Sequence, residues 1–285
     1  MRATACFLAL LLSGCGFEVE STGTIAPSAD GERCRLTGDT LTCAHATAEF
    51  EGGAFGATTR QVHFMTPATD APDEGFPVAI LFQGSFHSAE GMWSSTRGDD
   101  FGGFHETELV EALLDAGFAV VTPETRFDGS TFWDTNVVPF SSDWELSEDN
   151  ELMLALLDAI DAGELGPLDD DRLYAAGISS GGYMTSRMAV SYPGRFRRLA
   201  IQSASYATCS GALCVVPELR SDHPPTLFLH GQSDLIVPIG TMRDYAGALA
   251  SMGVQAPRFE DPSAGHEWLA EAPEQIVDWF LEDAR

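Results

Sequence analysis

The sequence contains no lysine, and all 15 of its basic residues are arginine. Aspartate and glutamate together number 43, which gives a formal net charge of −28 at pH 7. A surface of this sign repels phosphate backbones and anionic lipid headgroups, so it excludes nucleic-acid binding as a function. The missing lysine also argues against a phosphate-binding P-loop. Coding bias and adaptation of an acidic surface to salt explain the absence of lysine equally well.

Long hydrophobic runs are also absent. The apolar run 5–12 is too short to span a bilayer, but it has the length of the apolar core of a signal peptide. Leu12-Ser13-Gly14-Cys15 resembles a bacterial lipobox, which predicts a lipoprotein signal peptide over residues 1–14 and lipidation at Cys15. Secretion after cleavage nearby, without a lipid, is the alternative. Gly16 stands where lipoproteins of the inner membrane commonly carry aspartate. We therefore expect an exported protein, either anchored to the bacterial cell envelope, with the outer membrane favoured, or extracellular.

Cysteine is scarce: the sequence has six, and two of them fall within the predicted signal peptide and lipobox. The other four form two close pairs, which an oxidising compartment would join. Of the three pairings that four cysteines allow, we favour Cys34–Cys43 and Cys209–Cys214. Neither pair has the spacing of a zinc knuckle with histidines in register, so we expect no metal site and no other cofactor.

Strand-like and helix-like segments alternate along the chain from about residue 43. Apolar runs predict strands at 76–82, 118–122, 173–176, 199–202 and 226–230, and another near residue 258. Helices are predicted over 106–116, after an N-cap at Ser147, from the turn at 177–181 to about 192, over 242–252 and from 273. This alternation predicts an α/β fold with a mostly parallel sheet and helices on both faces.

The predicted organisation has three parts. The signal peptide, residues 1–14, is followed by residues 15–42, which hold a polar tether and the first cysteine pair. Residues 43–285 form a single catalytic domain. The irregular segment 127–146 is too short for a separate lid domain, so we expect an open cleft.

The motif G-x-S-x-G occupies residues 177–181, between a predicted strand and a predicted helix. Its glycines allow a turn that is too tight for side chains beside the serine. The strained turn lifts the hydroxyl of Ser179 above the carboxyl edge of the sheet. This context predicts that Ser179 is a catalytic nucleophile. A glycine-rich turn used for packing or for phosphate binding is the alternative.

A serine nucleophile needs a base, because its hydroxyl is a poor nucleophile until its proton is removed. His266 follows the last predicted strand and Asp234 follows an earlier one, so the three residues have the chain order serine, acid, histidine that this fold uses. We predict that Asp234 holds His266 in one tautomer and stabilises its charged form. Asp222 and Asp261 are the rival acids.

The anionic intermediate of acyl transfer needs amide donors. Ser180, immediately after the nucleophile, is expected to supply one backbone N–H group. The loop after the strand 76–82 is expected to supply the second, from Ser85 or, as the alternative, from Phe86. His87 lies just beyond this loop and is expected to line the cleft without acting as the base.

These motifs resemble those of α/β-hydrolases, and more narrowly those of the secreted polyhydroxybutyrate depolymerases and feruloyl and acetylxylan esterases. The similarity covers roughly residues 60–285. The matching stretches are Asp171-Arg172-Leu173-Tyr174, G-I-S-S-G-G-Y-M at 177–184, Tyr192-Pro193, the segment 203–209 that ends in a cysteine, His230-Gly231 with Asp234, and Gly265-His266. Gln83-Gly84 departs from the pattern, because such enzymes commonly carry His-Gly before the oxyanion loop.

The resemblance implies a serine carboxylesterase that forms an acyl-enzyme on Ser179 and resolves it with water activated by His266. It also implies a polymeric or bulky ester, docked by exposed aromatic residues. The expected substrate contacts are Phe86, Trp93 and Trp133, with Phe132 and Trp144 in similar loops. Packing in a small core is the alternative for these aromatic side chains.

Two other functions stay open. The sequence around Ser180 also resembles that of prolyl-oligopeptidase-like serine peptidases, although those usually carry an additional propeller domain. The third possible function is that of a non-catalytic binding lipoprotein of the envelope. The presence of serine, acid and histidine in the chain order of a catalytic triad argues against it. The expected partners are an ester substrate and, through the lipid anchor only, a membrane.

Overall fold

The computed structural model describes residues 32–52, 58–126, 131–209 and 214–284. The predicted signal peptide, the lipidation site Cys15 and most of the predicted tether lie outside the described residues. Within the described ranges, no helix is both long enough and apolar enough to cross a membrane.

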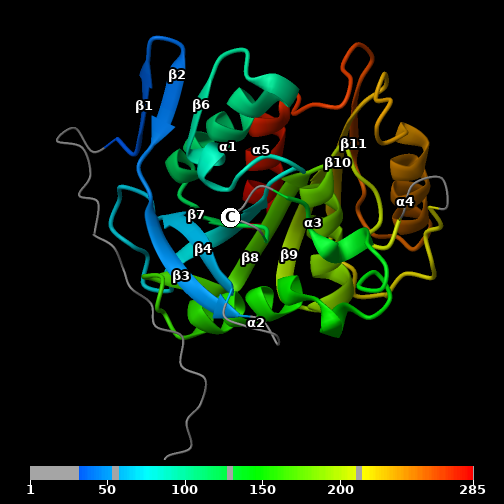
Figure 1. The fold of residues 1–285 in the computed structure, drawn as a ribbon, viewed down its shortest axis with the longest axis horizontal. Helices are drawn as coiled ribbons and strands as arrows, with labels where there is room; N and C mark the ends of the chain where they lie inside the picture. The colour runs from blue at the N-terminus through cyan, green and yellow to red at the C-terminus, as the bar shows by residue number, and fades with distance from the viewer. Residues whose placement is uncertain (1–31, 53–57, 127–130, 210–213, 285) are drawn as a thin grey trace, which may run out of the picture.

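A central sheet runs through the molecule with the strand order β11-β10-β9-β8-β5-β7-β4-β3 (Figure 1). Its strands are β3 (Ala46–Gly52), β4 (Thr58–Met65), β5 (Phe76–Phe82), β7 (Ala119–Pro123), β8 (Leu168–Ile178), β9 (Phe196–Gln202), β10 (Thr226–Gly231) and β11 (Arg258–Asp261). The strands from β11 to β7 are parallel to one another, whereas β3 and β4 add an antiparallel edge. Every strand predicted from the sequence is confirmed, and β3 and β4 are additions.

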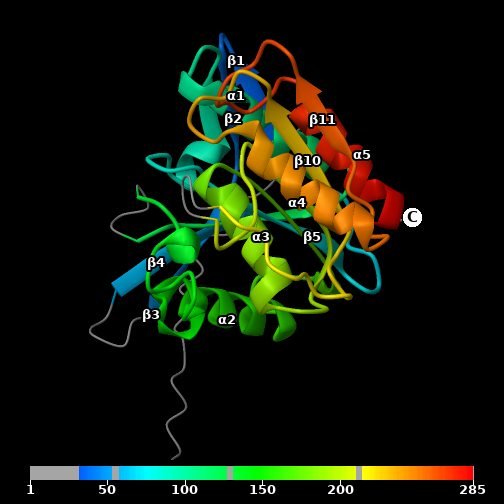
Figure 2. The same cartoon turned by 90° about the vertical axis from the view of Figure 1, so that its right-hand side faces the viewer.

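Helices cover both faces of this sheet (Figures 1 and 2). On one face lie α1 (Gly103–Asp115) and α5 (Ala272–Ala284). The other carries α2 (Glu148–Asp161), α3 (Ser180–Ser191) and α4 (Ile239–Ser251). Residues of β5 therefore enter the two cores alternately, with Ile80 in one and Leu81 in the other. The predicted α/β fold is confirmed, as is the N-cap of α2, where Ser147 Oγ accepts a hydrogen bond from Asp149 N at 3.0 Å.

A second sheet of three strands lies beside α1 and consists of β1 (Cys34–Thr37), β2 (Thr40–Cys43) and β6 (Ser94–Thr96) (Figure 1). The predicted disulfide Cys34–Cys43 joins β1 to β2 and is confirmed. Both cysteines and Leu41 are buried in the core that α1 shares. The predicted boundary between residues 42 and 43 is therefore wrong, because it cuts through β2. The hairpin belongs to the folded body.

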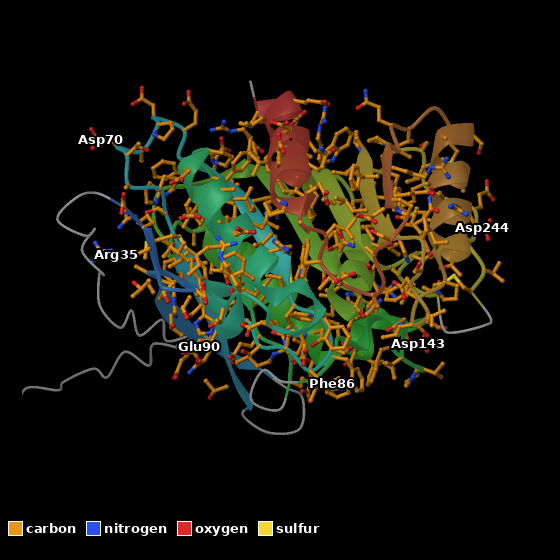
Figure 3. All side chains as sticks on the ribbon, turned by 90° about the horizontal axis from the view of Figure 1, so that it is seen from above. Arg35, Asp70, Phe86, Glu90, Asp143 and Asp244 are labelled. Carbon is orange, nitrogen blue, oxygen red and sulfur yellow. A yellow bond between two sulfur atoms is a disulfide. The ribbon has the colours of Figure 1, made fainter. Side chains whose placement is uncertain are left out.

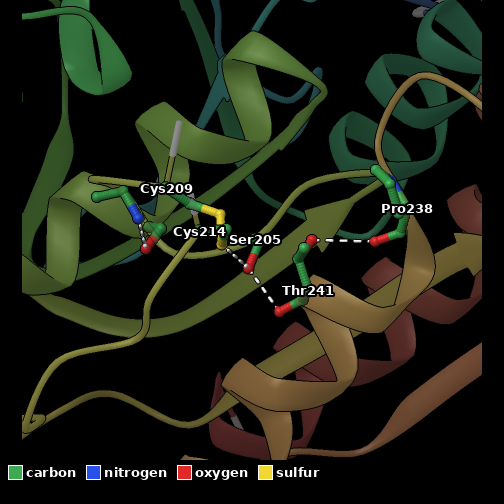
Figure 4. The surroundings of a disulfide bond; sticks show 7 residues. Ser205, Cys209, Cys214, Pro238 and Thr241 are labelled. Carbon is green, nitrogen blue, oxygen red and sulfur yellow. Dashed lines mark hydrogen bonds between the residues drawn. A yellow bond between two sulfur atoms is a disulfide. The ribbon is translucent and has the colours of Figure 1, made fainter. Parts of the chain in front are cut away.

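The second predicted disulfide, Cys209–Cys214, is also confirmed and follows β9 (Figure 4). The Cys214 sulfur lies 3.7 Å from Ser205 Oγ, which donates a hydrogen bond to Thr241 O at 2.6 Å. Thr241 is in the first turn of α4, the helix that follows the loop of Asp234. The disulfide therefore helps to connect the end of β9 to the element after the predicted acid.

Candidate active site

The turn that carries Ser179 joins the end of β8 to the start of α3. Ser179 has φ 54° and ψ −121°, a conformation that non-glycine residues rarely adopt and that strains the backbone. A Cβ atom at Gly181 would lie 1.9 Å from Phe82 O, and one at Gly177 would lie 2.5 Å from Gly181 O. Only glycine fits at these two positions. The structure thus contains the strand–turn–helix geometry that the motif predicts.

His266 lies in the loop between β11 and α5, and its Nδ1 is 2.8 Å from Asp234 Oδ2. Asp234 follows β10, two strands away from β8, so the carboxyl ends of parallel strands bring these residues to one edge of the sheet. The rival acids have other partners. Asp261 accepts hydrogen bonds from Ser263 and Ala264, and Asp222 pairs with Arg220.

The carboxylate of Asp234 is surrounded by donors. Its Oδ1 accepts hydrogen bonds from Ile236 N and Val237 N, both at 2.8 Å. His230 Nε2 lies 3.2 Å from Oδ2 and 2.9 Å from Val237 O. Burial alone would raise the pKa of Asp234, but the bonds from His230, His266 and the Val237 amide outweigh it and hold the pKa well below its ordinary value. Because an ionised carboxylate only accepts hydrogen bonds, the neutral ring of His266 carries its proton on Nδ1 and its free lone pair on Nε2.

Gln202, the last residue of β9, connects the serine turn to the histidine loop. Its backbone oxygen accepts a hydrogen bond from Ser179 N at 3.0 Å, and its side-chain Nε2 donates to Glu267 O at 3.0 Å. Neither this role nor that of His230 was predicted. The available signal was a polar residue at the end of an apolar strand, and both side chains are fully buried.

The predicted oxyanion loop lies against the serine turn, since a Cβ atom at Gly84 would be 3.8 Å from Ser179 Cβ. Phe86 N donates to Thr131 O at 3.0 Å, so this amide already has a partner. Within the described part of the chain, Ser85 N donates to no backbone oxygen. Ser180 N is at the first position of α3, where an amide has no partner inside the helix. The geometry therefore favours Ser85 over Phe86 as the second donor.

The expectation that Trp93 and Trp133 contact substrate is wrong, because both side chains are 0% exposed. Their indole N–H groups donate to Thr122 Oγ1 at 2.7 Å and to Gln83 O at 3.1 Å. Trp144 is also buried. Packing, the alternative reading, is the correct one for these tryptophans.

Other apolar side chains are exposed next to residues of the site. Phe86 is 82% exposed and lies at the outer edge of the molecule in Figure 3. The exposed ring of Phe101 lies 6.4 Å from that of His266. Leu235, 95% exposed, and the exposed Ile236 directly follow Asp234. We call Phe86, Phe101, Leu235 and Ile236 the apolar rim; only Phe86 was among the predicted contacts.

His87 lies beside Phe101 of the apolar rim. Its ring is 6.0 Å from that of Phe101, and burial lowers its pKa. Gln83 stands where related enzymes commonly carry histidine. Its side-chain Nε2 donates a hydrogen bond to His87 O and so holds the loop after β5. Among the described residues, one group of side chains could hold a metal ion, and it consists of Asp169, Asp170 and Asp171. This group lies at the opposite end of β8 from Ser179.

A buried carboxyl group supports the histidine loop from α1. Trp268 Nε1 donates a hydrogen bond to Glu106 Oε1, and Trp268 N donates to Phe101 O at 2.9 Å. Burial raises the pKa of Glu106 to about 7, although the bond from Trp268 lowers it.

We expect Glu106→Gln to stabilise the protein at pH 8 and to leave its stability nearly unchanged at pH 4. The folded-state pKa of Glu106 lies above the unfolded value, so the stability that it contributes is lost as pH rises from about 4.5 to about 7. The gain at pH 8 is on the order of 3 kcal/mol, because a pKa unit corresponds to about 1.4 kcal/mol. Urea unfolding at both pH values measures it, with Glu108→Gln on the same helix as the control. An equal effect of Glu106→Gln at both pH values would contradict this account.

Comparison with known proteins identifies the family. The chain is 45% identical over 241 residues to a poly(3-hydroxyoctanoate) depolymerase from Pseudomonas fluorescens, and the match covers 84% of this chain and 85% of that protein. The chain belongs to the poly(3-hydroxyoctanoate) depolymerase family. No protein-family model matches this depolymerase-family chain.

Solved structures share the α/β-hydrolase fold with this depolymerase-family chain. A protein assigned as a dipeptidyl aminopeptidase IV from Bacteroides ovatus has a TM-score of 0.61 at 17% identity, over 84% of this chain. The match spans only 36% of that longer protein. A thermostable esterase has a TM-score of 0.59 at 16% identity, over 84% of this chain and 62% of its own. At these identities the likeness shows the fold alone.

Proposed function

We propose that this chain is a serine carboxylic-ester hydrolase in which Ser179 is the nucleophile, His266 the base and Asp234 the acid that orients the base. The observation that carries the proposal is the 2.8 Å hydrogen bond from His266 Nδ1 to Asp234 Oδ2, at the sheet edge that also holds the strained turn of Ser179. The relative that hydrolyses poly(3-hydroxyoctanoate) supports an ester as the substrate.

In acylation, His266 Nε2 takes the hydroxyl proton of Ser179 while Oγ bonds to the carbonyl carbon of the ester. The carbonyl oxygen becomes an anion that accepts hydrogen bonds from the backbone N–H groups of Ser85 and Ser180. Collapse of this intermediate breaks the bond to the alcohol, which leaves with the proton from His266. Asp234 stabilises the imidazolium between the two proton transfers.

Deacylation repeats these steps with water. His266 takes a proton from the water, whose oxygen bonds to the acyl carbon. The bond from that carbon to Ser179 Oγ then breaks, and Oγ regains a proton from His266. The products are an alcohol and a carboxylic acid, and no cofactor is consumed.

We infer that the substrate is an apolar polyester or a bulky apolar ester. Exposed apolar side chains gain free energy when they leave water for an apolar surface. The apolar rim offers four such side chains near the proposed triad. The net charge of −28 disfavours strongly anionic esters. Similarity to a depolymerase of poly(3-hydroxyoctanoate) supports an aliphatic polymer over a feruloyl ester.

We expect the double substitution Phe86→Ser and Leu235→Ser to lower the hydrolysis rate of poly(3-hydroxyoctanoate) latex at least about tenfold, because burial of two large apolar side chains contributes several kcal/mol. Turnover of soluble p-nitrophenyl butyrate is expected to change less than about threefold. Leu36→Ser, on β1, removes an exposed apolar residue away from the rim and serves as the control. Equal losses on latex and soluble ester would show that the rim does not dock the polymer.

A fluorophosphonate probe tests the proposed nucleophile. We expect one probe per chain, mapped to Ser179 by peptide mass spectrometry, with no label after denaturation before exposure. A folded protein that stays unlabelled would favour the binding-lipoprotein alternative. Labelled protein that releases amines from a peptide panel but turns over no ester would favour the peptidase alternative.

We also propose that the protein is exported and lipidated at Cys15. The support is the apolar run 5–12 followed by the lipobox-like sequence, together with two disulfides, which persist in oxidising compartments. The depolymerase relative fits an exported enzyme. Palmitate labelling that disappears in Cys15→Ala would support lipidation, whereas an unlabelled protein in the medium would support simple secretion.

A further inference from the structure

The tripeptide Thr131-Phe132-Trp133 contacts both loops that carry the proposed oxyanion amides. Trp133 N donates a hydrogen bond to Ser180 Oγ at 2.8 Å. The indole N–H of the same residue donates to Gln83 O at 3.1 Å. Thr131 O accepts from Phe86 N at 3.0 Å. Two residues of this tripeptide, Thr131 and Trp133, therefore hold two loops that are far apart in the sequence with three hydrogen bonds.

These bonds enclose the two proposed donors. Ser85 lies between Gln83 and Phe86, whose backbone groups are held by Trp133 and Thr131. Ser180 is held through its own hydroxyl, next to its backbone N–H. The distance between the two donors therefore depends on the position of Trp133, which bonds to both loops.

We propose that Trp133 is a positioning residue, which sets the spacing of the Ser85 and Ser180 amides for the transition state of ester hydrolysis. The inference rests on the proposed function, because it requires those amides to form the oxyanion hole. It gives the buried tryptophan a role other than the substrate contact that the sequence predicted.

Trp133 can fix the distance between the two amides, because the residues packed around its side chain leave it little room to move. The ring is fully buried, packs edge-on against Phe82 at 5.3 Å between centroids, and has the Arg60 guanidinium 5.7 Å from its centre. The next residue is also fixed, since Asp134 N donates to Asp149 Oδ2 at 2.7 Å. Asp149 in turn pairs with Arg60 at 2.8 Å.

The expected kinetic effect follows from when the amides act. An oxyanion donor stabilises the anion of the transition state much more than the neutral carbonyl of the bound ester. A change in the spacing of the donors therefore lowers kcat and leaves KM nearly unchanged. A purely structural role would instead reduce the fraction of active protein and its melting temperature.

Trp133→Phe is the direct test, because it removes the indole donor and retains an aromatic ring and the backbone N–H. Trp279→Phe is the matched control. Trp279 Nε1 also donates to a backbone oxygen, that of Leu199 at 3.0 Å, and an arginine, Arg198, also lies over its ring. Trp279 is on α5, on the opposite face of the sheet from α3.

For each full-length purified variant, we would measure kcat and KM with p-nitrophenyl butyrate, the fluorophosphonate-labelled fraction, the melting temperature and inhibition by phenylboronic acid. We expect Trp133→Phe to lower kcat about 10- to 100-fold and to weaken inhibition by the boronate, which forms a tetrahedral adduct. Its KM and labelled fraction should stay within about threefold of wild type. Trp279→Phe should retain wild-type kcat at a comparable melting temperature.

The proposal is overturned if kcat falls by the same factor in the two variants. It is also overturned if the fall of kcat in Trp133→Phe is no larger than the fall in its fluorophosphonate-labelled fraction. If Trp133→Phe does not fold, Ser180→Ala decides, because it removes the acceptor of Trp133 N and keeps the Ser180 amide. A lower kcat at constant KM in Ser180→Ala supports the proposal, and an unchanged kcat overturns it. Failure of the proposed function is distinguishable, since wild type would then neither hydrolyse the ester nor be labelled at Ser179.

Discussion

We expect Ser179→Ala to lower kcat/KM for p-nitrophenyl butyrate by at least about 10⁴-fold. Without the hydroxyl no acyl-enzyme forms, so the only remaining route is direct attack by water on ester bound at the oxyanion amides. Residual catalysis of that kind is about 10³- to 10⁴-fold over the uncatalysed rate in serine hydrolases. Initial rates over a range of substrate concentrations measure the loss.

Ser191→Ala, at the other end of α3, is the control for this prediction. It removes a hydroxyl from the same helix, far along the chain from the turn, and should leave kcat/KM within about twofold. If Ser179→Ala retained more than about a tenth of wild-type activity, another residue would be the nucleophile. The fluorophosphonate-labelled peptide would then identify it.

We expect Asp234→Asn to lower kcat about 10³- to 10⁴-fold at pH 7. The carboxylate accepts the Nδ1 proton of His266 at 2.8 Å, whereas an amide can present its NH₂ group to the ring and favour the other tautomer. That tautomer carries its proton on Nε2 and cannot take the proton of Ser179. Two backbone amides and His230 keep their positions around the replaced side chain, so the fold should survive.

Asp261→Asn is the matched control, because Asp261 is the last residue of β11, at the carboxyl end of the strand next to β10. Its carboxylate accepts hydrogen bonds from Ser263 and Ala264 rather than from His266. We expect less than about a threefold change in kcat. A large loss in Asp261→Asn together with a small one in Asp234→Asn would reverse the assignment of the acid. Circular dichroism of both variants checks that the comparison is between folded proteins.

The turn of Ser179 could be predicted because its chemistry is local. Two glycines four residues apart, a preceding apolar run and a following amphipathic segment describe the strand, the turn and the helix within about 25 residues. The N-cap at Ser147 is equally local, as it depends on a bond to a backbone amide two residues later. The two disulfides were predictable for the same reason, since each closes a short loop.

The surroundings of the site could not be predicted, because they depend on contacts between distant segments. Trp93 and Trp133 were predicted to contact substrate because they follow predicted strands. Both are buried by loops, and the course of a loop cannot be predicted from the residues near it in the sequence. The exposure of Leu235 beside Asp234 is the converse case. An apolar residue in a loop has the same sequence signature whether it faces the core or the solvent.

The sequence by itself determined the fold class, the order of the three proposed catalytic residues, the disulfide pairs and the acidic character of the chain. Each of these depends on the composition of the chain or on the spacing of residues along it, and both are given by the sequence alone. Only the tertiary structure decided that Asp234 and not Asp222 or Asp261 bonds to His266, and that the β1–β2 hairpin belongs to the folded body. It also favoured Ser85 over Phe86 and showed that Gln202 and His230 support the site. These outcomes depend on hydrogen bonds between strand ends and loops, whose partners become neighbours only when the parallel sheet has formed.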